Sequence, residues 1–418
     1  MGGLQYAGFI IPILLLLVAI EYMISRRKNV ETYRFSDTIV NMSCGILERM
    51  FDLFYVVLLY FIFDFLSENF ALTHIPQNAF TWILALLVAD FLAYWHHRLS
   101  HEINFMWASH IVHHQSEELN LTTVFRVSAF AVINRSFFFI WMPLAGFSPA
   151  FTTSAIVFIG LYQFVTHTRL VGKLGFLEYI FVTPSSHRVH HGRNEKYLDK
   201  NYGHVFIFWD RLLGTYEEED ENEEVEFGIT TGFESSNPYW AYLHYWVDLF
   251  KRASKMDNFM DKVRVFLMPP TWAPESLPLA KVEYEVDATG KRKKYRLDVP
   301  VRLQLYVLFN ILLTVGGFMY LTFQKAELSA LQMGLLIATI AISVLAQGLL
   351  MERKKWALNT EYIRLGVSAA LVSVVFAFSP YNWIIIPVLL LVFMVFAFWA
   401  IRMRDYFGVE IRNPEPVM

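Results

Sequence analysis

Long apolar runs are the feature of this 418-residue sequence that most constrains its fold. A helix needs about 20 mainly apolar residues to cross a bilayer, and nine runs come near that length, at about residues 4–24, 40–66, 80–95, 125–144, 150–166, 301–323, 328–351, 362–379 and 383–401. The third and fifth runs are short, so we expect them to span only in part. Glu48, Arg49, Asp52 and Asp90 interrupt these runs and are expected to face protein or a polar cavity. The sequence therefore predicts an all-α, polytopic transmembrane helical bundle.

Basic residues in the short loops predict the orientation of the chain. They gather after the first run, after the seventh run and in the tail, at Arg26, Arg27, Lys28 and Arg34, at Arg353, Lys354 and Lys355, and at Arg402, Arg404 and Arg412. Residues 67–79 contain neither Lys nor Arg, and Lys325 stands alone. The N-terminus is thus expected outside, with the C-terminus and the histidine clusters on the cytoplasmic side of a bacterial inner membrane or the endoplasmic reticulum. A net charge of only −3 gives no electrostatic reason to expect nucleic-acid binding.

The apolar runs and one long polar stretch divide the chain into four regions. N-terminal transmembrane helices are expected in residues 1–79 and a histidine-rich catalytic region in 80–235. A cytoplasmic connecting segment follows in 236–300, and a four-helix transmembrane block in 301–418. The polar regions on the cytoplasmic side are expected to form a helical cap that holds a di-metal site. The single cysteine, Cys44, excludes an intramolecular disulfide.

Histidine spacing predicts the metal site. Ten of the 13 histidines fall within residues 96–191, and eight recur at helical spacing: His97 and His101; His110, His113 and His114; His187, His190 and His191. Residues at positions i, i+3 and i+4 share one face of a helix, so each cluster presents two or three imidazoles together. Eight nitrogens exceed the four usual for one zinc ion and suit two metals. Imidazole favours Fe, Zn, Cu or Ni over Mg or Ca.

Three further histidines lie near these clusters in the sequence. His167, at the cytoplasmic end of the fifth run, is the candidate ninth ligand. His96 would point away from its neighbour on a helix and is expected beside the metals, while the role of His204 stays open. An H-E-x-x-H metalloprotease motif is excluded, because Phe105 stands where its second histidine is required.

Several segments carry a family resemblance: HHRLSHE at residues 96–102, SHIVHHQSEE at 109–118, PSSHRVHHGRN at 184–194, NYG at 201–203 and WDRLLGT at 209–215. Together they resemble the fatty acid hydroxylase/sterol desaturase superfamily, and within it most closely the alkylglycerol monooxygenase branch. The resemblance implies a non-haem di-iron centre that activates O₂, with metal ligands at His97, His101, His110, His113, His114, His187, His190 and His191. Many members have an H-x-x-x-H pair on a membrane helix; here Gln163 takes the first position and His167 remains.

The resemblance further implies a lipid monooxygenase that takes its substrate from the bilayer. An ether lipid such as an alkylglycerol would be hydroxylated beside its ether oxygen, with a reduced pterin, tetrahydrobiopterin, as external electron donor. Glu102 occupies the position of an acidic residue that the branch associates with this pterin. Glu102 and Glu117 are the candidate catalytic carboxylates, and Asp199 and Asp210 are candidates for support of the metal ligands. Surface, ion-pair or capping roles remain open for all four.

Two alternatives remain. A sterol, sphingolipid, fatty-acyl or carotenoid hydroxylase or desaturase of the same superfamily would share the C–H abstraction step, so only substrate profiling separates these activities. A non-enzymatic metal transporter is the remote alternative. It would place ionisable ligands near the middle of the membrane, whereas these histidines are expected at helix ends on one side.

Overall fold

The computed structural model describes residues 2–280, 282, 284–286 and 291–408. Within these residues the chain forms fifteen α-helices and no β-strand, apart from three isolated bridges. The all-α fold predicted from the sequence is confirmed.

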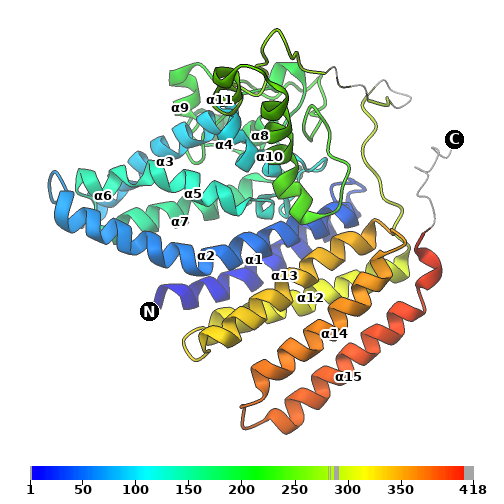
Figure 1. The fold of residues 1–418 in the computed structure, drawn as a ribbon. Coiled ribbons are helices and arrows are strands. Elements are labelled where there is room, and N and C mark those ends of the chain that lie inside the picture. Colours follow the sequence, from blue (N-terminus) through cyan, green and yellow to red (C-terminus); the bar gives the residue numbers. More distant parts are fainter. Residues whose placement is uncertain (1, 281, 283, 287–290, 409–418) are drawn as a thin grey trace.

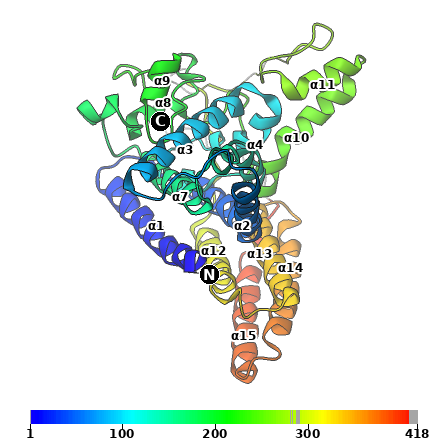
Figure 2. The same ribbon diagram turned by 90° about the vertical axis from the view of Figure 1, so that its left-hand side faces the viewer.

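Long helices dominate the N-terminal part of the chain (Figure 1). They are α1 (Gly2–Arg27), α2 (Phe35–Phe70), α3 (Ala79–Glu102) and α7 (Pro149–Thr166), with the short α5 (Ala129–Phe139) and α6 (Trp141–Ala145) before α7. Helix α3 packs against α5 and α7, and α2 packs against α5, α6 and α7. A second set of helices follows near the C-terminus: α12 (Val301–Gln324), α13 (Ala330–Met351), α14 (Ala357–Phe376), α15 (Asn382–Ile401) and η4 (Arg404–Tyr406). Figure 2 shows these helices extending away from the rest of the molecule, joined to it where α12 and α13 pack on α2.

Shorter helices cover one side of the N-terminal helices and lie along the upper edge of Figure 1. They are α4 (Asn104–His114), η1 (Thr123–Phe125), η2 (Gly175–Tyr179), α8 (Pro184–His190), η3 (Glu195–Tyr197), α9 (Phe208–Leu213), α10 (Pro238–Lys255) and α11 (Phe259–Leu267). The Thr183 side chain accepts from the Ser186 N–H at the start of α8, and Asn237 caps α10 in the same way. Both helices have proline just after the cap, where a missing N–H costs no hydrogen bond.

Six helices of the described chain are long and apolar enough to cross a membrane: α2, α3, α7, α12, α13 and α15. All six coincide with predicted runs. Helices α1 and α14 also form where predicted, with 26 and 20 residues. The expectation that the third run is too short was wrong, because α3 continues past residue 95 to Glu102 and reaches 24 residues. The fifth run, seen as α7, is likewise long enough.

The prediction of one helix over residues 125–144 was wrong. The chain leaves helical geometry at Arg126, and the Ser128 hydroxyl then accepts from the Phe130 N–H to start α5. Helix α6 ends at Gly146, whose φ of 107° suits glycine and where a Cβ would lie 2.2 Å from the Thr73 carbonyl oxygen. The two helices together are shorter than a membrane span.

Acidic residues inside the spans face protein, as predicted. Asp90 on α3 is fully buried and accepts three N–H groups of residues 205–209 at 2.8–3.1 Å. Glu48 and Asp52 on α2 are buried, and both pair with Arg49, at 2.5 and 2.9 Å. The expectation was wrong for Arg49 itself, whose side chain is 55% exposed. These contacts satisfy carboxylates that would otherwise be costly in the apolar part of the fold.

Candidate metal centre

All nine histidines singled out from the sequence come together in the structure. Within the described residues they form two groups, in each of which one nitrogen per ring lies within 4.8 Å of the others. The five-histidine group is His97, His101, His110, His114 and His190. The four-histidine group is His113, His167, His187 and His191. Across the described chain, neither group includes a carboxylate or a cysteine.

The C-terminal ends of four helices deliver these rings. Helix α3 carries His97 and His101 one turn apart, α4 carries the second cluster and α8 the third. His167 directly follows the last residue of α7. Because consecutive residues of a helix point about 100° apart, adjacent histidines fall into different groups, and each H-x-x-H-H cluster serves both. The groups therefore adjoin: the ring centroids of His114 and His191 are 4.6 Å apart.

Backbone carbonyl groups fix the direction of four rings. Their Nδ1 atoms lie 2.7–3.3 Å from carbonyl oxygens, His97 from Tyr202, His113 from Arg126, His167 from Gln163 and His190 from Lys200. A carbonyl oxygen only accepts a hydrogen bond, so Nδ1 carries the proton in each of these rings. Their Nε2 lone pairs are left for another partner, which is the arrangement found around protein-bound metals.

His113 and His167 show what this orientation requires. Their Nε2 atoms are 3.1 Å apart, and both rings hold their proton on Nδ1, so two lone pairs face each other. Such a pair is stabilised only by a cation. Other Nε2 atoms approach at 2.9–3.1 Å: His167 and His187, His187 and His191, His97 and His110, and His110 and His114. Nitrogens about 2.1 Å from one ion and at right angles would lie about 3.0 Å apart, so the donor set of each group fits a metal ion.

Burial keeps seven of these imidazoles neutral. Desolvation lowers the pKa well below its ordinary value of 6.5, and neighbouring histidines lower it further, for His110, His113, His114, His187, His190 and His191. Desolvation lowers the pKa of His167 to about 4. The neutral ring is the form that binds a metal, so no proton has to be displaced at pH 7.

Asp210 supports His97 through the backbone. Its carboxylate accepts the N–H groups of Tyr202 and Gly203 at 2.6 and 2.8 Å and the Thr215 hydroxyl at 2.8 Å. The Tyr202 carbonyl in turn accepts the Nδ1–H of His97 at 2.8 Å. Asp210 thus holds the turn that orients the ring and does not contact the ring itself.

The two candidate catalytic carboxylates lie outside both histidine groups. Glu102 ends α3, pairs with Arg98 at 2.8 Å and has a side chain that is 43% exposed. Glu117 accepts the Tyr295 N–H at 2.7 Å and lies 3.9 Å from Arg34. Desolvation raises the pKa of Glu117.

Three other predicted residues surround the groups. Asp199 faces the Nδ1 of His101 at 3.3 Å, with a side chain that is 67% exposed. His96 is buried outside both groups, as expected, with its ring 5.3 Å from that of Phe138. The His204 ring is 4.9 Å from that of His97, yet His204 belongs to neither group of the described chain.

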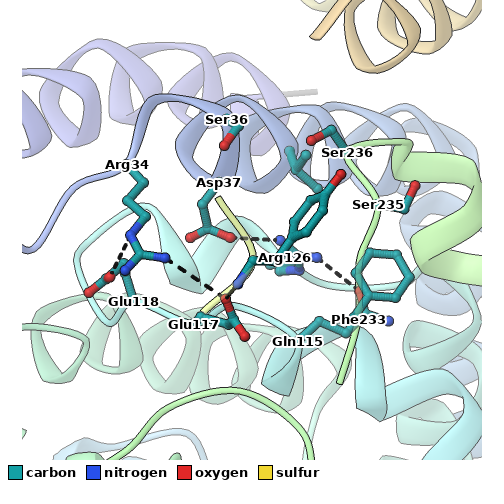
Figure 3. A pocket seen from close by; sticks show the side chains of 12 residues that line it. Arg34, Ser36, Asp37, Gln115, Glu117, Glu118, Arg126, Phe233, Ser235 and Ser236 are labelled. Atoms are coloured by element: carbon teal, nitrogen blue, oxygen red, sulfur yellow. Dashed lines mark hydrogen bonds and ion pairs between the residues drawn. The ribbon is translucent and has the colours of Figure 1, made fainter. Parts of the chain in front are cut away.

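A polar pocket is lined by Gln115, the residue that directly follows the second histidine cluster (Figure 3). Its lining includes Arg34, Asp37, Glu117, Arg126 and Phe233. Figure 3 shows the Asp37 carboxylate facing the Arg126 guanidinium, while Arg34 reaches toward Glu117. The pocket therefore joins the start of α2 to the segment that follows α4.

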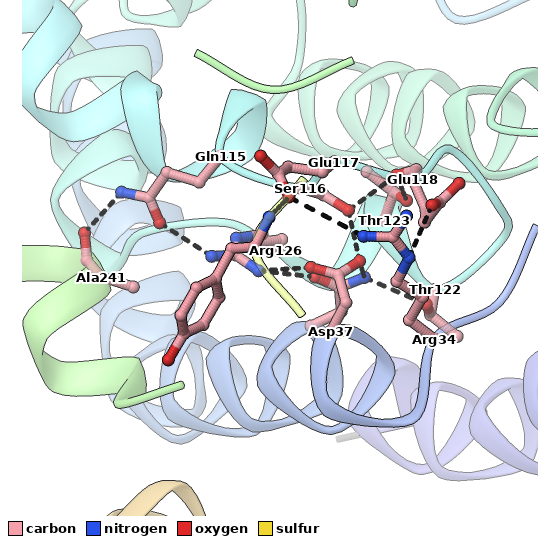
Figure 4. Close-up of polar contacts among 12 residues, drawn as sticks. Arg34, Asp37, Gln115, Ser116, Glu117, Glu118, Thr122, Thr123, Arg126 and Ala241 are labelled. Carbon is pink, nitrogen blue, oxygen red and sulfur yellow. Dashed lines mark hydrogen bonds and ion pairs between the residues drawn. The ribbon is translucent and has the colours of Figure 1, made fainter. Parts of the chain in front are cut away.

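Arg126 contacts the second histidine cluster, and the sequence did not single it out (Figure 4). Its Nε donates to the Val112 carbonyl at 3.0 Å, and its own carbonyl accepts from His113 Nδ1 at 3.3 Å. The side chain and backbone of Arg126 therefore hold two consecutive residues of the second cluster. An arginine at the start of an apolar run, two residues before a serine that can cap a helix, was the available indication.

Comparison with known proteins places this centre in a family. The fatty acid hydroxylase family model matches residues 82–215, which include all nine histidines. Alkylglycerol monooxygenase of Homo sapiens is 32% identical over 358 residues, covering 85% of this chain and 79% of that protein. The chain belongs to the alkylglycerol monooxygenase family. Membership in this family makes the protein a monooxygenase, and hence an oxidoreductase, and the resemblance seen in the sequence is confirmed.

Other relatives extend the comparison. Alkylglycerol monooxygenase of Danio rerio is 33% identical over 333 residues, covering 79% of this chain and 74% of that protein. Ornithine lipid hydroxylase OlsE of Rhizobium tropici is 31% identical over 161 residues, covering 36% of this chain and 46% of that protein. No solved structure matches the chain.

Proposed function

We propose that this protein is a membrane-bound di-iron monooxygenase that hydroxylates a C–H bond of a lipid with O₂. The observation that most supports it is the pair of adjoining groups in which nine histidines converge, seven of them buried. Five nitrogens in one group exceed the tetrahedral set typical of zinc, and an imidazole set without thiolate suits iron. Iron also follows from the activity, because zinc has no redox chemistry to offer O₂.

The nine histidines are the proposed metal ligands, and the chain around them positions and shields the site. Two bound irons would supply the reductive activation of O₂. The carbonyl groups that accept Nδ1 protons hold each ring with Nε2 turned inward. Burial excludes water, which protects a reactive oxidant from side reactions.

The proposed substrate is an alkylglycerol. Hydroxylation of the carbon beside the ether oxygen puts one atom of O₂ into the lipid and the other into water, and consumes two electrons and two protons. The resulting hemiacetal breaks its C–O bond to release a fatty aldehyde and glycerol. A tetrahydropterin would supply the electrons by oxidation to the dihydropterin level. Glu102 is the proposed pterin contact, because its carboxylate is accessible at the end of α3, and Glu117 is the second candidate carboxylate.

We further infer that the histidine groups lie on the cytoplasmic side of a multi-pass membrane protein. This placement is supported by the basic residues of the loops on the same side as the ends of α3 and α7. A bacterial inner membrane and the endoplasmic reticulum both fit this orientation.

Metal analysis tests the centre itself. Purified wild-type protein should contain about two irons per chain, and the His190→Ala/His191→Ala variant, which removes one ligand from each group, should lose most of them. His74→Ala is the matched control, because His74 is an exposed residue of the α2–α3 loop outside both groups. Zinc alone, or no bound metal in correctly folded protein, would contradict the proposal.

Product analysis tests the substrate. Iron-loaded protein with an O-alkylglycerol, tetrahydrobiopterin and ¹⁸O₂ should release fatty aldehyde that carries ¹⁸O before exchange with water. The matched monoacylglycerol is the control, since it has no ether-linked CH₂ group. A hydroxylated sterol or acyl lipid in place of aldehyde would assign a sister activity. No oxygenated lipid at all would refute the monooxygenase assignment.

A further inference from the structure

Helices α10 and α11 form a hairpin with a large exposed apolar surface. Phe250, Phe259, Met260 and Leu267 are 62%, 73%, 54% and 61% exposed. Soluble protein surfaces rarely present apolar side chains this large in one contiguous patch. Figure 2 shows α11 projecting from the body of the protein, at the end of α10.

The exposed face of α11 has the pattern of a helix that lies in a membrane interface. At about 100° per residue, Phe259, Val263, Leu267 and Met260 occupy one arc of about 100°, and Val265 on the opposite side is fully buried against the protein. Lys262 and Arg264 fall at the two edges of the apolar arc. Long basic side chains at those edges can bury their stems while their charges reach lipid phosphates.

Helix α10 shows the same division. Its buried face includes Ala241, Tyr245 and Leu249, which pack in the protein core. Its exposed face has an apolar half and a charged half: Trp240, Leu243 and Phe250 in the first, and Lys251, Lys255 and Asp248 in the second. A surface helix that faced only water would carry polar residues across its whole exposed face.

Hydrogen bonds fix this hairpin at the level where two membrane-spanning helices end. Asn104, two residues beyond α3, donates its backbone N–H to the Met268 carbonyl at the end of α11, at 3.0 Å. Its side-chain oxygen accepts the Tyr245 hydroxyl of α10 at 2.6 Å. Just before the other end of α10, the Ser235 hydroxyl and the Ser236 N–H donate to the Glu352 carboxylate, directly after α13, at 2.7 and 2.9 Å.

The apolar surface is also continuous with α5, a short apolar helix of the N-terminal part of the chain. Trp246 of α10 lies 5.2 Å from the Phe105 ring and 5.9 Å from the Phe130 ring, measured between centroids. Phe105 and Phe130 are 44% and 40% exposed, and Phe130 belongs to α5. Apolar aromatic side chains therefore connect the hairpin with the exposed apolar side of α5.

We propose that the α10–α11 hairpin is a monotopic membrane-binding element. It lies in the interface of the same leaflet that contains the ends of α3 and α13, with the apolar arc of α11 among the upper acyl chains and its flanking basic residues at the phosphates. The occupant of the exposed surface is thus the lipid bilayer and not a second protein. This inference is independent of the reaction that the metal centre performs.

Site-directed spin labelling can test this placement, because the chain has one cysteine, Cys44, which is buried. In a Cys44→Ala background, single cysteines replace Val263 and Leu267 on the apolar arc. Leu313, a 52% exposed residue of α12, provides the lipid standard, and Glu221, with an 83% exposed side chain, provides the aqueous standard. Each labelled protein is reconstituted in phosphatidylcholine–phosphatidylglycerol vesicles, after its metal content and elution profile have been matched to the parent.

Collision with dissolved O₂ and with a water-soluble nickel chelate then reports the surroundings of each nitroxide. Labels at 263 and 267 should favour O₂ over nickel, as the label at 313 does and the label at 221 does not. Labels at 263 and 267 that behave like the label at 221 would place the surface in water and overturn the proposal. Low access to both reagents would also overturn it, because that result places the surface against protein.

Discussion

Replacement of Arg126 by methionine is expected to remove both stability and metal from this protein. The Arg126 guanidinium is almost fully buried, and its partners come from two other segments of the chain, the start of α2 and the end of α4 (Figure 4). It donates to Asp37 at 3.2 Å, to Asn41 at 3.1 Å and to Gln115 at 3.0 Å, in addition to the Val112 carbonyl at 3.0 Å. Methionine fills a similar volume and satisfies none of these acceptors.

The expected loss of folding stability follows from the acceptors that the substitution leaves without a donor. Removing one partner of a buried ion pair costs about 3–5 kcal/mol. Asp37 keeps two weaker partners, the Ser116 hydroxyl at 2.5 Å and the Asn41 amide at 3.4 Å, so we expect a loss of about 4 kcal/mol. For a chain of this size, such a loss lowers the melting temperature by about 5 °C. Asp37→Asn in the same protein should recover part of it, because it neutralises the carboxylate left without its arginine.

Metal content separates a positioning role from a structural one. Arg126 holds Val112 through its side chain and His113 through its carbonyl, so the variant should retain less iron per folded chain, with Arg126→Lys intermediate. Arg364→Met is the matched control: Arg364 is also buried, pairs with Glu361 at 2.5 Å and lies in α14, away from the histidines. Melting curves and metal-to-protein ratios of both variants provide the comparison. If Arg126→Met melts as early as Arg364→Met but keeps a full complement of iron, Arg126 does not position the metal ligands.

Three further outcomes are expected. Below pH 6.5 the histidines of the unfolded chain bind protons that the buried histidines of the folded protein do not bind, so metal-free protein should lose stability as the pH falls, by about 1.4 kcal/mol per pH unit for each such histidine. His167 contributes to this loss down to its pKa of about 4. Equal melting temperatures at pH 7.5 and 5.5 would contradict this prediction. Asp210→Ala removes the carboxylate that accepts the Tyr202 N–H, and it should weaken iron binding about 10–100-fold in an iron titration. Asp199→Ala removes an exposed and screened carboxylate, and it should weaken iron binding less than about threefold in the same titration. Gly146→Ala forces a side chain into a left-handed turn and a close contact, which should lower the melting temperature by an amount equivalent to about 1–3 kcal/mol and leave the iron-to-protein ratio unchanged.

The sequence predicted which histidines meet, because helical spacing is a local property. It did not predict which rings of different helices share a group. His113 and His114 are adjacent in the chain yet serve different groups, and only the crossing of α4 with α3, α7 and α8 decides which ring meets which. That crossing depends on tertiary packing, which has no counterpart in residue spacing.

The sequence also could not predict which atoms orient the histidine rings. Four of them are backbone carbonyl oxygens, of Arg126, Gln163, Lys200 and Tyr202, and every residue has such a group. The broken fourth run, in contrast, had a local cause that the sequence contained. Ser128 can cap a helix, and a buried arginine just before it needs acceptors that a lipid-facing helix cannot offer.

The hydrogen-bond pattern explains why such a centre selects a metal over protons. In the pair formed by His113 and His167, both Nδ1 protons are committed to carbonyl groups, so the facing Nε2 atoms need a cation. A proton could serve, but burial and the charge of neighbouring rings lower the pKa of His113 far below 7. A divalent ion accepts several of these nitrogens at once, whereas a proton can join only two. The same burial that makes protonation unfavourable therefore makes the site available to metal at neutral pH.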